Sequence, residues 1–265
     1  MKILGRRPSR YIANLVKIPE YARLFWKCRA TFQDPLAVIR AYVTRQPPPG
    51  GVITLRSGLV LHLSADPLDV VTVFGVFIRE DYGRVPANAA VIDIGANIGV
   101  FTIYAVHCGA RRVDAYEPSA ESFAALERNV RANGLEGRAV VHRAAVWDGS
   151  SASVRFPRGS SVLNAVLAAD AGAAHDDVPA TSLDAVVRDV GTVDLLKMDC
   201  EGAEARILAA AASSTFGAIR EIRLEYHLGL GREVETRLNQ QGFRTSFKWA
   251  PNDEGGILWL TRRAA

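Results

Sequence analysis

The chain is 265 residues long, 49% hydrophobic and 23% charged, so it can bury a core of domain size without disulfide or metal staples. Its three cysteines, Cys28, Cys108 and Cys200, lie far apart and form no C-x-x-C pair, which argues against a disulfide framework or a cysteine zinc site and favours a reducing cytoplasm. The net charge of +4 is uneven, because residues 1–50 hold ten Lys and Arg against two acidic residues, a net +8, and the remainder carries −4.

The basic N-terminal arm, residues 1–50, has two interpretations. Either it meets an acidic partner, such as a membrane surface contacted peripherally, a phosphorylated glycolipid or nucleic acid, or it is a solvated arm in an Arg-rich protein. No RNA-binding module is visible, so a nucleic-acid partner is not expected. The longest apolar stretch, near residues 70–78, is too short to cross a bilayer, and no secretory signal follows the first arginines.

The spacing of apolar residues, the positions of prolines and the alternation of apolar with polar residues predict the elements in the first third of the chain. The predicted elements are two helices within 11–43, broken near Pro19 and near Asp34–Pro35, a linker at 46–51, a β-hairpin at 52–63 and a helix at 70–82. The linker divides the chain into an N-terminal helical extension, residues 1–50, and a domain formed by residues 51–265.

From residue 89 onward, short apolar strands alternate with helices, which is typical of an α/β fold with a parallel sheet. The predicted strands are 90–94, 111–116, 139–146, 193–198 and 219–226, the predicted helices are 98–107, 119–133, 182–189, 201–212 and 231–240, and strands 243–249 and 256–261 end the chain as a hairpin. Residues 148–180 interrupt this rhythm with a short strand at 154–156 and are predicted to form a loop or lid over a site. Right-handed crossovers place the ends of the parallel strands at the sheet edge where ligands bind.

The glycine turn after the first of these strands, VIDIGANIGVF at residues 91–101, is the most informative segment. Its pattern is D-x-G-x-x-x-G, formed by Asp93, Gly95 and Gly99, and Glu117 follows at the end of the next strand. Glycines let the backbone approach a ligand, and a carboxylate on the second strand accepts hydrogen bonds from ribose hydroxyls. The third glycine of G-x-G-x-x-G is missing, and Asp93 would repel a pyrophosphate but suit a cationic cofactor such as S-adenosylmethionine. The alternative is a tight turn that binds no ligand.

Two longer motifs contain this turn and a second charged segment. The first combines residues 93–102 with 116–134, and the second, VDLLKMDCEGAEARIL at 193–208, follows a Ser-Leu-Asp stretch at 182–184. On these motifs the chain resembles the FkbM-type family of S-adenosylmethionine-dependent methyltransferases, whose K-x-D-x-E-G-x-E segment the second motif matches. The resemblance covers roughly residues 82–227.

This resemblance implies both a fold and an activity. The fold is an α/β Rossmann-like class I methyltransferase, with a mostly parallel seven-stranded sheet, helices on both faces, a terminal antiparallel hairpin and the N-terminal extension. The activity is O-methylation by S-adenosylmethionine of a hydroxyl, in a sugar, glycolipid or glycosylated natural product. The expected partner is therefore a hydroxyl-bearing small molecule or a glycan.

The predicted cofactor site collects residues from several loops. Asp93 would hold the ammonium group of S-adenosylmethionine, directly or through water, and Glu117 would bind both ribose hydroxyls. Ala144 and Ala145 would leave room for the adenine ring, and Asn97 has a second interpretation as a helix N-cap. The residues predicted to bind the cofactor are Asp93, Gly95, Ala96, Asn97, Gly99, Glu117, Pro118, Ala144, Ala145 and Asp199.

Four charged residues at the ends of two later strands are predicted to be catalytic: Lys197, Asp199, Glu225 and His227. His227 would act as general base for the acceptor hydroxyl, whose oxygen attacks the methyl carbon. An alternative is a divalent metal bound by Asp199, Glu225 and His227, which would lower the pKa of that hydroxyl. The structural alternatives are an internal ion pair of Lys197, with Asp199 capping the next helix, and a hydrogen-bonded histidine at a strand end.

Two other functional classes fit parts of the sequence. A nicotinamide-dependent oxidoreductase would use a similar glycine turn, although the missing third glycine argues against it. A non-catalytic cofactor-binding protein would keep the turn without an acceptor site. The basic arm and segment 148–180 would supply either acceptor binding or the subunit interface of a homo-oligomer.

Overall fold

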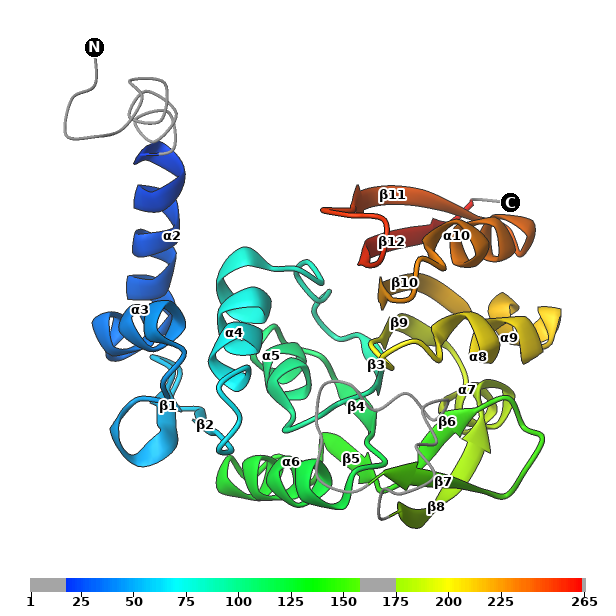
Figure 1. The fold of residues 1–265 in the computed structure, drawn as a ribbon, viewed down its shortest axis with the longest axis horizontal. Helices are drawn as coiled ribbons and strands as arrows, with labels where there is room; N and C mark the ends of the chain where they lie inside the picture. Colours follow the sequence, from blue (N-terminus) through cyan, green and yellow to red (C-terminus); the bar gives the residue numbers. More distant parts are fainter. Residues whose placement is uncertain (1–17, 158–174, 264–265) are drawn as a thin grey trace.

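The computed structural model describes residues 18–157 and 175–263. Its centre is a seven-stranded sheet in the order β11–β12–β10–β9–β3–β4–β5 (Figure 1). Strands β5, β4, β3, β9 and β10 run parallel, whereas β12 is antiparallel to both of its neighbours. The strands are β3 (Ala90–Ile94), β4 (Arg112–Tyr116), β5 (Ala139–His142), β9 (Val193–Met198), β10 (Ile219–Tyr226), β11 (Phe243–Trp249) and β12 (Gly256–Arg262). The predicted α/β fold with its mostly parallel sheet and terminal hairpin is confirmed.

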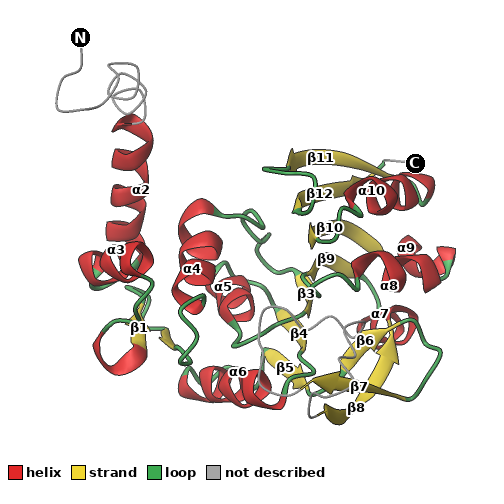
Figure 2. Ribbon diagram, in the orientation of Figure 1, coloured by secondary structure: helices red, strands yellow, loops and turns green. Residues whose placement is uncertain are grey.

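Helices cover both faces of this sheet (Figure 2), because successive strand residues point to opposite sides. Fully buried Val91 and Leu195 belong to one core cluster, together with residues of α5 and α6. Fully buried Ile92 and Leu196 belong to the other, with residues of α7 to α10. The helices are α5 (Val100–His107), α6 (Ala120–Ala132), α7 (Leu183–Val190), α8 (Glu204–Ala210), α9 (Ser213–Gly217) and α10 (Gly231–Gln240).

The connections of the sheet reverse direction between β3 and β9. The chain runs outward from β3 to β4 and β5, and later returns to β9 on the other side of β3 before it continues to β10. The loops that follow β3 and β9 therefore diverge at the carboxyl ends of two adjacent strands. Ligands bind at this kind of switch point in α/β sheets.

One predicted strand is wrong. Residues 139–146 form not a single strand but β5 and then β6 (Ala145–Trp147), which belongs to a separate three-stranded sheet in the order β6–β8–β7. β7 (Ser153–Pro157) contains the predicted strand 154–156, whereas β8 (His175–Ser182) was missed within the predicted lid. The middle of that lid, residues 158–174, lies outside the described residues.

The described part of the N-terminal extension packs on the same core as the sheet. Helix α2 (Ile18–Thr31) extends away from the sheet in Figure 1. Helix α3 (Pro35–Thr44) begins at the predicted break near Asp34–Pro35, and the side chain of Asp34 caps it. Fully buried Cys28 and Phe32 join the core cluster that contains Val91. The boundary at residue 50 therefore stays a prediction, since the core continues across it. No described helix is both long and apolar enough to cross a membrane.

The predicted hairpin at 52–63 is formed by β1 (Val52–Thr54) and β2 (Val60–His62). The next predicted helix, 70–82, divides into α4 (Asp69–Phe74) and a π-helical turn, η2 (Gly75–Arg79). The side chain of Asn129, fully buried on α6, fixes the hairpin: its Oδ1 accepts the N–H of His62 at 2.7 Å, and its Nδ2 donates to the carbonyls of His62 at 3.0 Å and Ile98 at 2.8 Å. One side chain thus connects the hairpin, α6 and the glycine turn.

We expect Asn129→Ala to lower the free energy of unfolding by about 2–3 kcal/mol, because it leaves one backbone N–H and two carbonyls without a partner. Urea denaturation of the variant measures the loss. Arg131→Ala, an exposed substitution two residues further along α6, is the control and should change stability by less than about 0.5 kcal/mol. Equal stability of the two variants would contradict this role of Asn129.

Candidate functional site

The glycine turn after β3 is shaped by close backbone contacts. Gly95 has a φ of +75°, and a Cβ at this position would lie 1.8 Å from the carbonyl oxygen of Asp199, so no other residue fits there. The N–H groups of Gly95 and Ala96 both donate to the carbonyl of Tyr116. Gly99, with a φ of +90°, precedes α5 and packs against Leu126 of α6. The turn is thereby held against both β4 and the loop after β9.

Glu117 lies at the end of β4 and is 6% exposed. Its two carboxylate oxygens accept backbone N–H groups, Oε2 from Asn97 and Oε1 from Ser119, each at 2.8 Å. Burial raises the pKa of Glu117 to about 7, although these two hydrogen bonds and the charge of Lys197 lower it. Each oxygen keeps a lone pair for a further donor. Glu117 is therefore a rigid acceptor of two hydrogen bonds, as the prediction of ribose binding requires.

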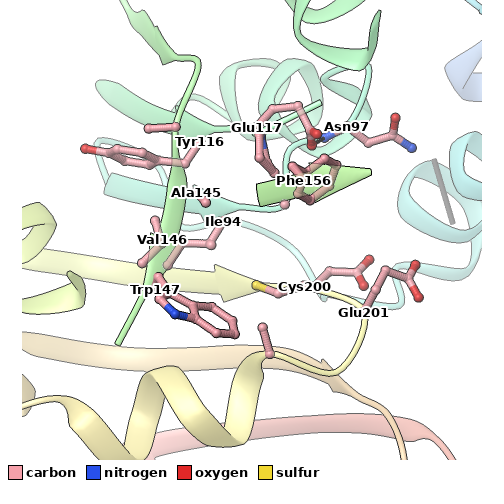
Figure 3. A pocket seen from close by; sticks show the side chains of 15 residues that line it. Ile94, Asn97, Tyr116, Glu117, Ala145, Val146, Trp147, Phe156, Cys200 and Glu201 are labelled. Carbon is pink, nitrogen blue, oxygen red and sulfur yellow. Dashed lines mark hydrogen bonds between the residues drawn. The ribbon is translucent and has the colours of Figure 1, made fainter. Parts of the chain in front are cut away.

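A narrow pocket opens between the glycine turn and the small sheet (Figure 3). One portion of its lining is apolar and consists of Ile94, Val146, Trp147 and Phe156. Another portion is polar and contains Asn97 and Glu117. The buried Oδ1 of Asn97 accepts no hydrogen bond from the described residues. The remaining lining residues are Gly95, Tyr116, Pro118, Ala144, Ala145, Asp199, Cys200, Glu201 and Ala203.

A second, larger cavity of about 430 Å³ adjoins the first. Helix α4 and the turn η2 supply an apolar wall that includes Val71 and Val76, and the opposite wall is acidic. The two cavities share four lining residues: Gly95, Asn97, Asp199 and Glu201. The acidic wall contains Asp199, Glu201 and Glu225, together with His227, whereas Asp81 lies beside η2 and pairs there with Arg79.

The structure places Asp93 elsewhere than the ammonium-binding position predicted for it. Its carboxylate is fully buried, lies 3.0 Å from Nζ of Lys197 and accepts the hydroxyl hydrogen of Thr102 at 2.7 Å. It lines neither cavity, and neither does Gly99. Asp93 and Lys197 are directly paired across β3 and β9, so the partner of Lys197 is Asp93 and not Asp199. Their role is to fix the turn, because Nζ also donates to the carbonyl of Gly95 at 2.7 Å.

Asp199 and Glu225 meet at the hydroxyl of Tyr82, which donates to Oδ2 of Asp199 at 2.8 Å and to Oε2 of Glu225 at 3.4 Å. Burial, followed by the charge of Asp199, raises the pKa of Glu225 to about 7. Tyr82 itself is 5% exposed, and burial holds its pKa well above the usual range. The neutral hydroxyl thus remains a donor to both carboxylates at the end of the sheet.

His227 follows β10 and lies among three carboxylates. Its Nδ1 is 3.2 Å from Oε1 of Glu204, and its Nε2 is 3.6 Å from Oε2 of Glu201 and 4.0 Å from Oε1 of Glu225. Burial lowers the pKa of His227, but Glu204, Asp199 and Glu201 outweigh it and raise the value to about 9. A protonated imidazole does not accept a proton, which argues against the general-base role predicted for His227 at neutral pH.

The structure brings together most of the predicted residues, from distant parts of the chain. Gly95, Asn97, Glu117, Pro118, Ala144, Ala145 and Asp199 line the narrow pocket, and Ala96, Lys197, Asp199, Glu225 and His227 line the larger cavity. Sequence reasoning missed Tyr82, because it lies 117 residues before Asp199 and nothing in its spacing indicates the contact. It also missed Trp147, since the strand that contains it was predicted to end at residue 146, and Glu201, which was assigned to a helix that begins only at Glu204.

The segment that forms most of this site matches a known protein family. The profile described as "Methyltransferase FkbM domain" matches residues 93–245, more than half of the chain. This segment contains all residues that line the two cavities except those within 68–82. The chain belongs to the FkbM methyltransferase family. It is therefore a methyltransferase, and the resemblance predicted from its two motifs is confirmed.

Two curated relatives share parts of this chain. Methyltransferase sdnD of Sordaria araneosa is 28% identical over 210 residues, which cover 65% of this chain and 81% of that protein. The tRNA wybutosine-synthesizing protein 2 homolog of Danio rerio is 44% identical over 58 residues, only 22% of this chain and 14% of that protein.

Solved structures with similar folds include other methyltransferases. The ribosomal protein L11 methylase from Lactobacillus delbrueckii subsp. bulgaricus has a TM-score of 0.42 and 16% identity, covering 75% of this chain and 78% of that one. A protein of the NADB-Rossmann superfamily from Streptococcus agalactiae has a TM-score of 0.45 and 14% identity, covering 69% and 66%.

We expect Lys197→Met and Asp93→Asn each to destabilise the protein by about 3–5 kcal/mol, because each leaves a buried charge without its partner. The double variant should recover most of that loss, since it removes both charges together. Urea denaturation of the three variants forms a double-mutant cycle. Lys248→Met breaks the half-exposed pair with Glu235 and serves as control, with a change of at most about 1 kcal/mol. Additive losses in the double variant would contradict the coupling.

Proposed function

We propose that this methyltransferase uses S-adenosylmethionine to methylate a hydroxyl of a sugar, a glycolipid or a glycosylated natural product. The observation that carries the proposal is the pair of adjoining cavities, which share Gly95, Asn97, Asp199 and Glu201. A cofactor in the narrow pocket and an acceptor in the larger one would meet at these four residues. Methyl transfer requires such a meeting point, because the reacting atoms must be held close together and in line.

The narrow pocket suits the parts of S-adenosylmethionine. Its apolar wall of Ile94, Trp147 and Phe156 fits a flat adenine ring, which Ala145 leaves room for. Glu117 accepts two ribose hydroxyls with its remaining lone pairs, and the unused Oδ1 of Asn97 accepts a further donor. The Gly95 turn admits no side chain, so its backbone can approach the ligand.

The larger cavity suits a neutral acceptor with several hydroxyl groups. Its apolar wall from α4 would contact the face of a sugar ring or an attached lipid, and its carboxylates would accept hydrogen bonds from hydroxyls. The carboxylates would repel an anionic acceptor, which argues against a phosphate near the reacting oxygen. An attachment point for a phosphorylated carrier would therefore have to lie outside this cavity.

In this proposal, Asp199 and Glu225 have separate catalytic roles. S-adenosylmethionine supplies an electrophilic methyl group on a positively charged sulfur. Asp199, oriented by Tyr82, stabilises positive charge at the junction of the two cavities. Glu225, also contacted by Tyr82, faces the acceptor cavity and accepts the proton that the hydroxyl loses. Burial of the apolar walls excludes water that would otherwise compete with the acceptor.

We expect Glu117→Ala to weaken binding of S-adenosylmethionine and S-adenosylhomocysteine at least tenfold, because two hydrogen bonds to ribose are lost. For the wild type, affinity should fall about tenfold between pH 8 and pH 6, since the carboxylate of Glu117, with a pKa of about 7, becomes protonated over this range. Isothermal titration calorimetry measures both effects, and Glu121→Ala, exposed in the first turn of α6, is the matched control. NADH should not bind, and tighter binding of NADH than of either sulfur ligand would favour an oxidoreductase.

We expect Glu225→Gln to lower kcat for methyl transfer by about 10²-fold, as for the loss of a general base, with little change in cofactor affinity. Release of S-adenosylhomocysteine over a panel of neutral glycosides, phosphorylated sugars and amines is the measurement. Glu221→Gln, on the same strand but paired with Arg223 outside the cavity, is the control. Turnover with amines alone would overturn the assignment to hydroxyl acceptors.

A further inference from the structure

A group of metal-ligating side chains lies at the junction of the two cavities. Asp199 and Glu201 follow β9, His227 follows β10, and one ligand atom from each lies within 4.8 Å of the other two. All three line the larger cavity, and Asp199 and Glu201 line the narrow pocket as well. The set combines two carboxylates with one imidazole from two adjacent strands.

Glu204 fixes the orientation of the His227 ring through its contact with Nδ1. This glutamate is 1% exposed, and its carboxylate accepts the backbone N–H groups of Cys200 at 2.7 Å and Gly202 at 3.0 Å. With Nδ1 of His227 only 3.2 Å away, Nδ1–H donates to Glu204 and Nε2 turns to Glu201. A cation bound at Nε2 would replace the proton that this nitrogen carries in the imidazolium form. Metal-binding histidines commonly use this arrangement, in which a carboxylate holds the other ring nitrogen.

The charge around this group is unbalanced. The nearby cationic side chains have other partners: Lys197 pairs with Asp93, Arg79 with Asp81, and Arg223 with Glu221. Within 18–157 and 175–263, no Lys or Arg nitrogen lies within 4 Å of the carboxylates of Asp199, Glu201, Glu204 or Glu225. His227 is the one basic side chain of the described residues that lies within 4.0 Å of Glu201, Glu204 and Glu225, and a divalent cation would neutralise the excess negative charge.

We propose that Asp199, Glu201 and His227 bind one divalent cation at the junction of the two cavities, with Glu204 and Tyr82 as positioning residues for His227 and Asp199. The donor set of two carboxylates and one imidazole, with no thiolate, suits Mn²⁺ or Mg²⁺ better than a soft metal. The open side of the ion faces the acceptor cavity, where it would orient the acceptor hydroxyl and favour loss of its proton. This last role rests on the proposed function, whereas cation binding itself does not.

The proposal corrects the metal set inferred from strand periodicity, in which Glu225 was the second carboxylate. Glu225 extends from β10 and reaches Tyr82, and its Oε1 lies 4.0 Å from Nε2 of His227. Glu201 lies closer, at 3.6 Å, because its left-handed backbone, with a φ of +52°, turns the loop after β9 back towards His227. Glu225 is thereby left free for the acceptor.

Titration of the EDTA-treated full chain with MnCl₂, followed by the electron paramagnetic resonance signal of free Mn²⁺, tests the proposal. We expect one saturable site in the wild type, and at least tenfold weaker binding in Glu201→Gln and in His227→Gln. Glu233→Gln, an exposed substitution on α10, should bind as the wild type does. Circular dichroism checks that all variants are folded. The absence of saturable Mn²⁺ binding, or unchanged affinity in folded Glu201→Gln, would overturn the site.

Calorimetry with S-adenosylmethionine in EDTA separates this proposal from the proposed function. Cofactor binding without any Mn²⁺ site would overturn the cation and leave methyl transfer intact. A Mn²⁺ site without cofactor binding would support the cation and overturn the proposed function. Where both bind, Mn²⁺ or Mg²⁺ should raise kcat of the wild type at least tenfold and leave that of Glu201→Gln unchanged.

Discussion

The buried ion pair between Lys197 and Asp93 is the interaction on which the rest of the site depends. Both side chains are almost inaccessible, at 4% and 0% exposed, and they join the two strands between which the sheet reverses direction. A lysine in such surroundings is tolerated only when its charge is matched and its N–H groups have acceptors. The carbonyl of Gly95 supplies one acceptor, and the rings of Tyr82 and Phe101 lie 5.5 and 5.9 Å away. The pair therefore fixes the backbone path of the glycine turn, through the hydrogen bond from Lys197 to the carbonyl of Gly95.

That turn explains why the cavities lie where they do. Gly95 touches the backbone of Asp199, so the loops after β3 and β9 are in direct contact and their residues line both cavities. On one side lies Glu117, held by two backbone N–H groups. On the other side lie Asp199 and Glu225, joined through Tyr82. The charge of Lys197 is matched by Asp93, so the carboxylates of Asp199, Glu201 and Glu225 leave an excess of negative charge at the junction.

Much of the fold was predictable because its signals are local. Apolar runs and their spacing placed β3, β9, β10 and α10 at the residues that the structure gives. The first motif, with its D-x-G-x-x-x-G turn, and the second motif indicated the family, and together they contain Gly95, Asn97, Glu117 and Asp199 of the narrow pocket. The errors arose where the position of a segment depends on a strand that is distant in the sequence. Ala145–Trp147 pairs with β8 and so leaves the main sheet, which no periodicity within 139–146 could show.

The sequence by itself therefore determined the α/β order, the glycine turn and the charged strand ends, since each depends on residues close together in the chain. Only the tertiary structure decided which charges meet. The strand periodicity placed Lys197 on the same face as Asp199, whereas the register of β3 against β9 pairs it with Asp93. The loop after β9 selected Glu201 as the neighbour of His227, and packing of η2 brought Tyr82 to Asp199. Such pairings follow from strand register and loop conformation between segments that are distant in the sequence, and a linear pattern does not contain them.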